Sequence, residues 1–306
     1  MRGVPLVLGL TLLAGGCAAP PGTGTGKTSP YLYEDTRRLV DLVEEAARRI
    51  ESRGTAAFVD FAGDPGRWKR SGLYLFVYDE NGRNVFHGAL PELVGHDLSG
   101  MRDLLGRPMV REVAGVARRP ERDAGAWVFY LWEEHSEFLP RWKASYVRKA
   151  VAPDGRAFAV GSGSSRLKVE KAWVKDRVDR FVEVLRQEGK AAAFTVLRDP
   201  ASPFQFFDTY LFVTDGTGRA LVDPSFPTRT GRDLGAFRDA VGRYVLKDVA
   251  IKLETSDEAW AQYLWPRPGE TLPSRKALYV RKVVVAGETL LVGSDFYLAS
   301  PVWMKH

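Results

Sequence analysis

The chain repeats itself once over most of its length, and this duplication limits its fold more than any other feature. Residues 74–79 and 210–215 share tyrosine, leucine, phenylalanine, valine and a closing aspartate at an offset of 136. Residues 143–149 return as 276–282 at an offset of 133, and residues 161–162 return as 293–294. Ordered blocks with small insertions between them indicate a duplicated domain. Because each copy is long enough to bury its own core, the pattern predicts a tandem pair rather than a solenoid of short units.

Each copy begins with an amphipathic helix. Apolar residues recur at spacings of three and four from Leu39 to Ile50, with Asp35 or Thr36 as the expected cap and Gly54 as the expected end. In the second copy the same spacing runs through residues 173–185 and ends at residue 189.

Strand-like runs follow each helix. They occupy residues 73–78, 127–132, 145–152 and 156–161 in the first copy, and 209–214, 260–265, 277–286 and 289–294 in the second. Glycine-bearing turns at 153–155 and 286–287 join the last two strands of each copy as hairpins. One long helix before an antiparallel sheet predicts an α+β module, present twice.

The repeated blocks resemble the Cache family of extracellular sensor domains, in its smaller single-Cache form. The resemblance covers nearly the whole chain from residue 36 to residue 300. It is carried by residues 74–82, 95–98, 265–268, Trp260, Tyr263, Lys276, Tyr279 and Val280. It implies a PAS-like fold, in which a long helix packs on a central antiparallel sheet and small molecules bind on one sheet face without catalysis. We therefore expect two tandem PAS-like Cache modules, at residues 36–167 and 168–306.

Aromatic residues and cations alternate along the predicted strands and form a candidate ligand site. Tyr130 and Trp132 share a face of one strand, as do Tyr146 and Arg148 on another. Aromatic rings supply buried area, tyrosine hydroxyls donate hydrogen bonds, and an arginine pairs with carboxylates. Lys143 precedes its predicted strand, but the resemblance favours it as an anion partner. The candidate ligand-contacting residues are Tyr263, Trp265, Lys276, Tyr279 and Arg281 in the second copy, and Tyr130, Trp132, Lys143, Tyr146 and Arg148 in the first.

Two simpler interpretations of these residues stay open. Aromatic residues on a strand are usually core packing, and the adjacent cations can face water. The second copy is the favoured binder, because residues 265–268 follow the family pattern there. In the first copy, Trp132 is followed by two glutamates that would lie near the mouth of the pocket.

The N-terminus has the pattern of an export signal ending in the only cysteine. Arg2, an apolar stretch from Val4 to Leu13 and three small residues precede Cys17. Residues 13–17 resemble a bacterial lipobox, which predicts a signal peptide at 1–17, acylation of Cys17 and a flexible tether at 18–35. An ordinary secretory signal remains the alternative. Ala18 after the cysteine favours the outer membrane over the inner, with the modules facing the periplasm.

Composition excludes several other classes. A single cysteine rules out an intrachain disulfide and a zinc site built on several thiolates. The net charge of +6 comes from short basic runs mixed with acids, which does not favour nucleic acid. The four histidines have no metal-ligand spacing, so no cofactor, metal or catalytic residue is expected.

These features together predict a lipid-anchored, non-catalytic sensor in the cell envelope. Its expected ligand is an organic acid or amino acid, with a carboxylate favoured and the second module the better binder. Since no second apolar span and no kinase or methyl-accepting region is expected, a signal would pass to a membrane partner. The alternative is a pocketless adaptor that scaffolds a membrane-associated complex.

Overall fold

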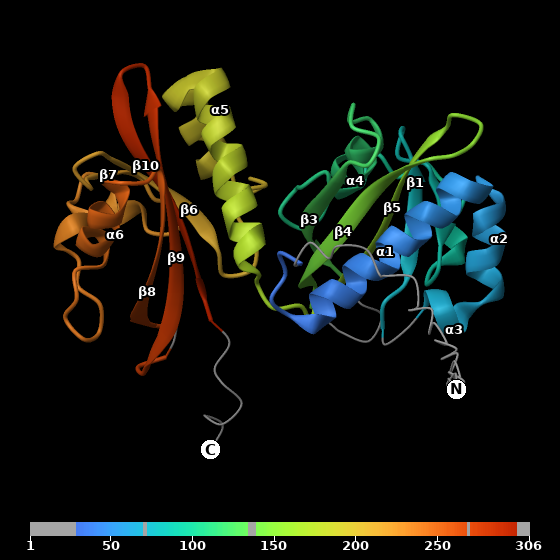
Figure 1. Ribbon diagram of the computed structural model, residues 1–306, viewed down its shortest axis with the longest axis horizontal. Helices are drawn as coiled ribbons and strands as arrows, with labels where there is room; N and C mark the ends of the chain where they lie inside the picture. The colour runs from blue at the N-terminus through green and yellow to red at the C-terminus, as the bar shows by residue number, and fades with distance from the viewer. Residues whose placement is uncertain (1–28, 70–71, 134–138, 268–269, 299–306) are drawn as a thin grey trace, which may run out of the picture. The chain divides into compact units, whose positions relative to one another are not determined.

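The computed structural model describes residues 29–69, 72–133, 139–267 and 270–298. Cys17, the expected signal peptide and most of the expected tether lie outside these residues. Each half of the described chain forms a helix-covered, five-stranded antiparallel sheet (Figure 1). The predicted α+β class and the duplication are therefore confirmed. No helix within the described ranges combines the length and apolarity that a membrane crossing requires.

The first module begins with α1 (Glu34–Arg53), α2 (Ala56–Gly63) and α3 (Pro65–Trp68). Its strands are β1 (Leu75–Asp79), β2 (Asn84–His87), β3 (Gly125–Trp132), β4 (Arg141–Val151) and β5 (Ala157–Ser164), in the sheet order β2-β1-β5-β4-β3. The turn η1 (Pro91–Leu93) and α4 (Met109–Ala117) lie between β2 and β3 in the chain.

The second module repeats this plan. Helix α5 (Lys171–Arg198) precedes β6 (Tyr210–Asp215), β7 (Ala220–Val222), β8 (Glu258–Pro266), β9 (Pro273–Val285) and β10 (Glu288–Tyr297). The sheet order is β7-β6-β10-β9-β8, which matches the first sheet strand for strand. The turns η2 (Pro227–Arg229) and η3 (Leu234–Ala236) and helix α6 (Val245–Leu253) occupy the place of η1 and α4.

Helix ends differ in part from the sequence prediction. Helix α1 begins at Glu34, one residue before Asp35, so neither Asp35 nor Thr36 is its cap, and Thr36 is fully buried. Gly54 ends the helix as predicted, with a positive φ of 58° that suits glycine. The expected end at Gly189 is instead a break with φ 78° and ψ 171°, after which helical residues continue to Arg198.

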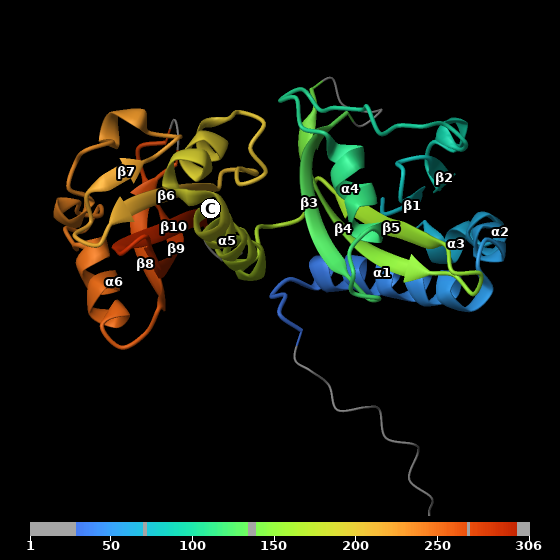
Figure 2. The same ribbon diagram turned by 90° about the horizontal axis from the view of Figure 1, so that it is seen from above.

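Both faces of each sheet are covered by helix. In the first module α1 packs on β4 and β5, and α4 packs on the opposite face (Figure 2). In the second module α5 packs on β9 and β10 and α6 packs against β8. Each sheet consequently separates two apolar clusters, since successive strand residues point to opposite faces.

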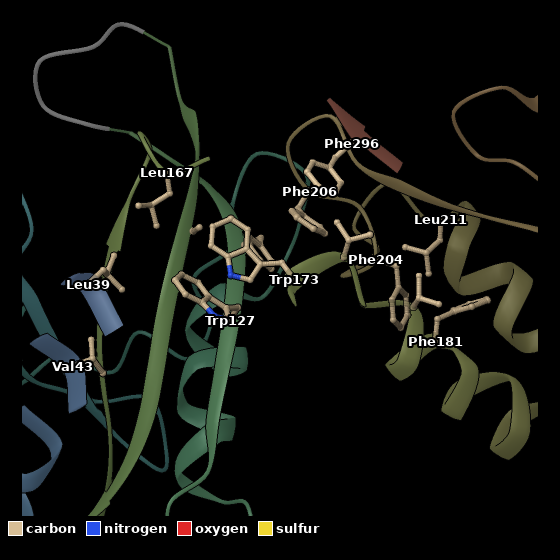
Figure 3. Packing of buried hydrophobic residues seen from close by; sticks show 14 of the residues in the cluster. Leu39, Val43, Trp127, Leu167, Trp173, Phe181, Phe204, Phe206, Leu211 and Phe296 are labelled. Carbon is tan, nitrogen blue, oxygen red and sulfur yellow. The ribbon is translucent and has the colours of Figure 1, made fainter. Parts of the chain in front are cut away.

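The face covered by the long helix holds the main core. In the second module Phe181 of α5 meets Phe204 edge to face at a centroid distance of 5.1 Å, and Leu211 of β6 belongs to the same cluster (Figure 3). All three side chains are at most 5% exposed. Such burial stabilises the module by about 25 cal/mol for each Å² of apolar surface removed from water. The other face, under the shorter helix, holds one cavity in each module.

Candidate functional site

A cavity of about 80 Å³ lies between the second sheet and the segment that carries η2, η3 and α6. Since one water molecule needs about 10–15 Å³ measured in the same way, the cavity has room for a small organic molecule. The polar and aromatic residues in its wall are Tyr210, Asp223, Arg229, Phe237, Arg238, Asp239, Tyr263, Trp265, Lys276 and Asp295.

A buried ion pair forms part of the cavity wall. The ammonium Nζ of Lys276 on β9 lies 2.6 Å from Oδ1 of Asp295 on β10, and the two side chains are 5% and 7% exposed. The hydroxyl of Tyr263 donates to the other carboxylate oxygen of Asp295. Tyr263 stands directly opposite Lys276 in the β8–β9 register, so neighbouring strands hold all three groups together. Burial, together with the charge of Asp295, raises the pKa of Tyr263 well above its usual value, which keeps this hydroxyl a donor.

A second cation lies nearer the solvent. Arg229 of η2 is 21% exposed, and its guanidinium lies 3.7 Å from the ring centroid of Phe226. Its NH1 is 3.5 Å from Oδ2 of Asp223, whose side chain is 1% exposed. The other oxygen of Asp223 accepts the backbone N–H of Phe226 at 3.0 Å. Burial raises the pKa of Asp223, because the ionised carboxylate loses hydration that a long contact with Arg229 restores only in part.

Asp239 also lines the cavity, but its oxygens are engaged in the protein's own hydrogen bonds. It accepts from the backbone N–H groups of Val241, Arg243 and Leu264 and from the guanidinium of Arg243. These hydrogen bonds outweigh desolvation and lower the pKa of Asp239 to about 2. Asp103 accepts equivalent backbone bonds in the first module, so this aspartate has a structural role in both copies.

The first module has a smaller cavity, of about 20 Å³, at the equivalent place. Lys143 donates from Nζ to the hydroxyl of Tyr74 at 2.5 Å and lies 5.2 Å from the ring centroid of Trp132. Tyr130 stands opposite Lys143 in the β3–β4 register, as Tyr263 does opposite Lys276. Tyr78 lines this cavity where the second copy has Thr214, and the larger side chain takes up space.

The structure thus places six of the ten candidate residues in the two cavity walls. They are Tyr130, Trp132 and Lys143 in the first module and Tyr263, Trp265 and Lys276 in the second. Both lysines lie inside strands rather than before them, because β4 begins at Arg141 and β9 begins at Pro273. The superposition implied by the duplication therefore holds at these cross-strand pairs.

The remaining four candidates lie on the opposite sheet faces, under the long helices. Tyr146 donates to Oε1 of Glu44 on α1 at 2.8 Å, and Arg148 donates to Oε2 of the same residue at 3.2 Å. In the second module Tyr279 is fully buried and receives a hydrogen bond from Lys175 on α5 at 2.7 Å, and Arg281 pairs with Asp179 of that helix. We predicted all four in the pocket, but they lie on the other sheet face because their strand positions differ from those of Lys143 and Lys276 by an odd number.

Sequence reasoning missed most of the second cavity wall, including Tyr210, Asp223, Arg229 and Asp295. Three of these four are visible as differences between the copies. At the offsets of the matched blocks, Asp223 replaces His87, Arg229 replaces Leu93 and Asp295 replaces Gly163. Changes of charge between two otherwise similar copies were the available signal.

Neither cavity has the groups expected of a catalytic metal centre. Within the described ranges no cluster of three or more histidine, cysteine, aspartate or glutamate side chains could hold a metal ion. His87 lines the first cavity, but its Nδ1 accepts the N–H groups of Ala89 and Leu90. Burial, aided by the charge of Lys143, lowers the pKa of His87 to about 4.

Comparison with known families agrees with this geometry. The single Cache domain 2 family matches residues 44–164 and, a second time, residues 166–299. The chain belongs to this family. The predicted tandem Cache organisation is confirmed, and no enzyme family is indicated.

Among curated proteins, the chain is similar to the methyl-accepting chemotaxis protein McpP of Pseudomonas putida, with 28% identity over 91 residues. The match covers 30% of this chain and spans about a sixth of the receptor, 16% of its length.

The chain is also similar to three solved structures from chemotaxis or chemosensory proteins. One is a periplasmic sensor domain of a chemotaxis protein, 25% identical, covering 41% of this chain and 88% of that one, with a TM-score of 0.33. A second is a Cache chemosensory domain described for its carboxylic acid recognition, at 20% identity, 41% and 88% coverage and a TM-score of 0.34. A third is a methyl-accepting chemotaxis protein from Vibrio parahaemolyticus, at 15% identity, 43% and 88% coverage and a TM-score of 0.32.

Proposed function

We propose that the chain is a non-catalytic sensor protein that binds a small carboxylate-bearing molecule in the cavity of its second module. The observation that carries the proposal is the joint presence of Arg229 and Tyr210 in the wall of a cavity of about 80 Å³. A guanidinium pairs with carboxylates through two parallel hydrogen bonds, and a tyrosine hydroxyl donates one more. Trp265 and Phe237 supply the apolar wall that a ligand's carbon skeleton needs.

The choice of the second module rests on available space. The first cavity, at about 20 Å³, has room for only one or two waters, whereas the second has about 80 Å³. Residues 265–268 follow the family pattern in this copy, and Trp265 lies on β8.

A pocketless adaptor is the alternative function. Buried charges in a cavity wall speak against it, because well-packed apolar residues of similar volume would stabilise a purely structural module as well or better. Lys276, Asp295 and Asp223 are each at most 5% exposed as whole residues.

The test is a thermal-shift and calorimetric screen of the chain from Ala18 onward against organic acids, amino acids and amines. A ligand at 100 times its Kd stabilises the protein by about 2.7 kcal/mol, which is a readily measured rise in Tm. Arg229→Gln should abolish the response. The matched control is Arg232→Gln, since Arg232 is exposed and lies outside the cavity wall. A chain that responds to no member of the screen would favour the adaptor.

We also infer that Cys17 carries a lipid anchor that holds the modules at the periplasmic face of the outer membrane. The lipobox-like residues 13–17 and the Pro/Gly/Thr-rich stretch after them support this. Several acyl chains, at about 0.8 kcal/mol for each buried CH₂, would make the attachment almost irreversible. Cys17→Ser should move the protein from the membrane fraction to the soluble fraction, and unchanged fractionation would contradict the anchor. Its signalling partner in the membrane would then be found by crosslinking from the anchored protein.

A further inference from the structure

The two copies differ most in the charge of their cavity walls. Asp295 takes the position of Gly163, and Asp223 takes the position of His87. Both aspartates line the second cavity, and their side chains are 7% and 1% exposed. The second copy therefore carries two buried carboxylates at places where the first copy has none.

Asp295 already pairs with Lys276, the buried cation to which a ligand carboxylate would otherwise bind. Its Oδ1 lies 2.6 Å from Nζ of Lys276, and its Oδ2 accepts from Tyr263. A ligand carboxylate that approached Lys276 would meet the negative charge of Asp295 in a poorly hydrated place, where like charges repel more strongly than in water. Because Lys276 and Asp295 neutralise each other, the inner end of the cavity offers no uncompensated cation to a ligand carboxylate.

The outer end has the opposite character. Arg229 is 21% exposed, against 5% for Lys276, and its contact with Asp223 is long at 3.5 Å. Its guanidinium lies on the ring of Phe226 and within 6.0 Å of the ring centroid of Trp265, which fixes its place at the wall. A ligand carboxylate would be received here.

The balance of charges in the cavity wall indicates which other charged group the ligand carries besides its carboxylate. Among the wall residues that are not exposed, two cations, Lys276 and Arg229, face two anions, Asp223 and Asp295. The carboxylate of Asp239 is compensated by Arg243, and Arg238 is a third wall cation whose exposed guanidinium is hydrated by water. A simple carboxylate would leave one excess negative charge in the cavity, and burying an unpaired charge is costly. A ligand that also carries a protonated amine leaves none.

We propose that Asp295 is the specificity-determining residue of the second module, and that the ligand is a zwitterion whose ammonium group faces Asp295 and Asp223 while its carboxylate faces Arg229. This rests on the proposed function and narrows its ligand class. The first module, with glycine and histidine at these two positions, does not share the selectivity.

The experiment compares matched ligand pairs by titration calorimetry on the chain from Ala18 onward: propionate with alanine, butyrate with 2-aminobutyrate, and succinate with aspartate. The members of each pair differ by one α-amino group. The amino member should bind about tenfold or more tightly, the difference expected of a hydrogen bond to a charged group. Asp295→Asn keeps an acceptor for Tyr263 and removes the charge, so the amino member should lose about tenfold while its partner gains affinity.

Two further variants keep the result interpretable. Asp257→Asn removes the same charge from an exposed residue that pairs with Lys282 outside the cavity wall, and both affinities should stay unchanged. If Asp295→Asn does not melt cooperatively, Asp223→Asn should show the same loss for the amino member. Equal binding of both members to the unsubstituted chain, or an Asp295→Asn variant that keeps the preference, overturns the zwitterion and leaves a carboxylate sensor standing. If no member of any pair binds, the proposed function fails along with it.

Discussion

Replacing Lys276 by methionine should destabilise the second module by several kcal/mol, because it leaves Asp295 buried without its counter-ion. The pair is 2.6 Å apart, with side chains 5% and 7% exposed. Removing one partner of such a pair typically costs about 3–5 kcal/mol, whereas replacing both is often close to neutral. Lys276→Met should therefore lose about 3–5 kcal/mol of unfolding free energy, and Lys276→Met with Asp295→Asn should recover most of that loss.

The assay is urea unfolding of the four proteins of this double-mutant cycle, with hydrogen exchange of the β9 and β10 amides to assign the loss to the second module. Lys190→Met is the control. Lys190 pairs with Glu288 at the surface, where the side chains are 36% and 60% exposed, so its loss should cost about 1 kcal/mol or less. A double variant as unstable as the sum of the two single variants would refute the reasoning, because it would show no coupling between the two charges.

Two other predictions concern packing and pH. Gly293→Ala should destabilise the chain by about 1–3 kcal/mol, because the added Cβ would lie 2.3 Å from the ring of Phe212, whereas Gly63→Ala meets nothing within 4 Å and should change the Tm little. The pKa of His87 falls from 6.5 to about 4 on folding, so the unfolded chain binds a proton that the folded chain does not between these values. Stability should be complete above about pH 6.5 and fall by about 3 kcal/mol as the pH drops to about 4, and His87→Gln should remove this slope in pH-dependent urea titrations. A slope that survives in His87→Gln would assign it to other groups.

Much of the candidate site could be predicted from one repeated pattern. Alternation along the strands placed Tyr130 with Trp132 and Tyr263 with Trp265, and both pairs line cavities. The same alternation could not say which face of a sheet holds the cavity. Each sheet is covered by helix on both faces, so Tyr279 finds a hydrogen-bond partner under α5 just as Tyr263 finds one beside the cavity.

The short helices and turns between the second and third strands of each module were the main omission. Helices α4 and α6 have nine residues each, and none of their ends is marked by a side-chain cap. Arg229, the cation nearest the solvent, lies on the three-residue turn η2, which carries no periodicity that a sequence pattern could show. Three residues cannot complete a hydrophobic repeat, so such elements are recognised only when the chain is folded.

The sequence by itself determined that one α+β module occurs twice, where its long helices and hairpins fall, and which aromatic residues share a strand face. These properties depend on residues close together in the chain or on a regular spacing between residues, so the sequence alone specifies them. The tertiary structure alone decided that Asp295 neutralises Lys276 and that Arg229 of the turn η2 lines the cavity. It also decided that Arg281 pairs with Asp179 of α5 and does not line the cavity. Such pairings depend on side chains brought together across strands and loops, and no spacing along the chain encodes a distance in space.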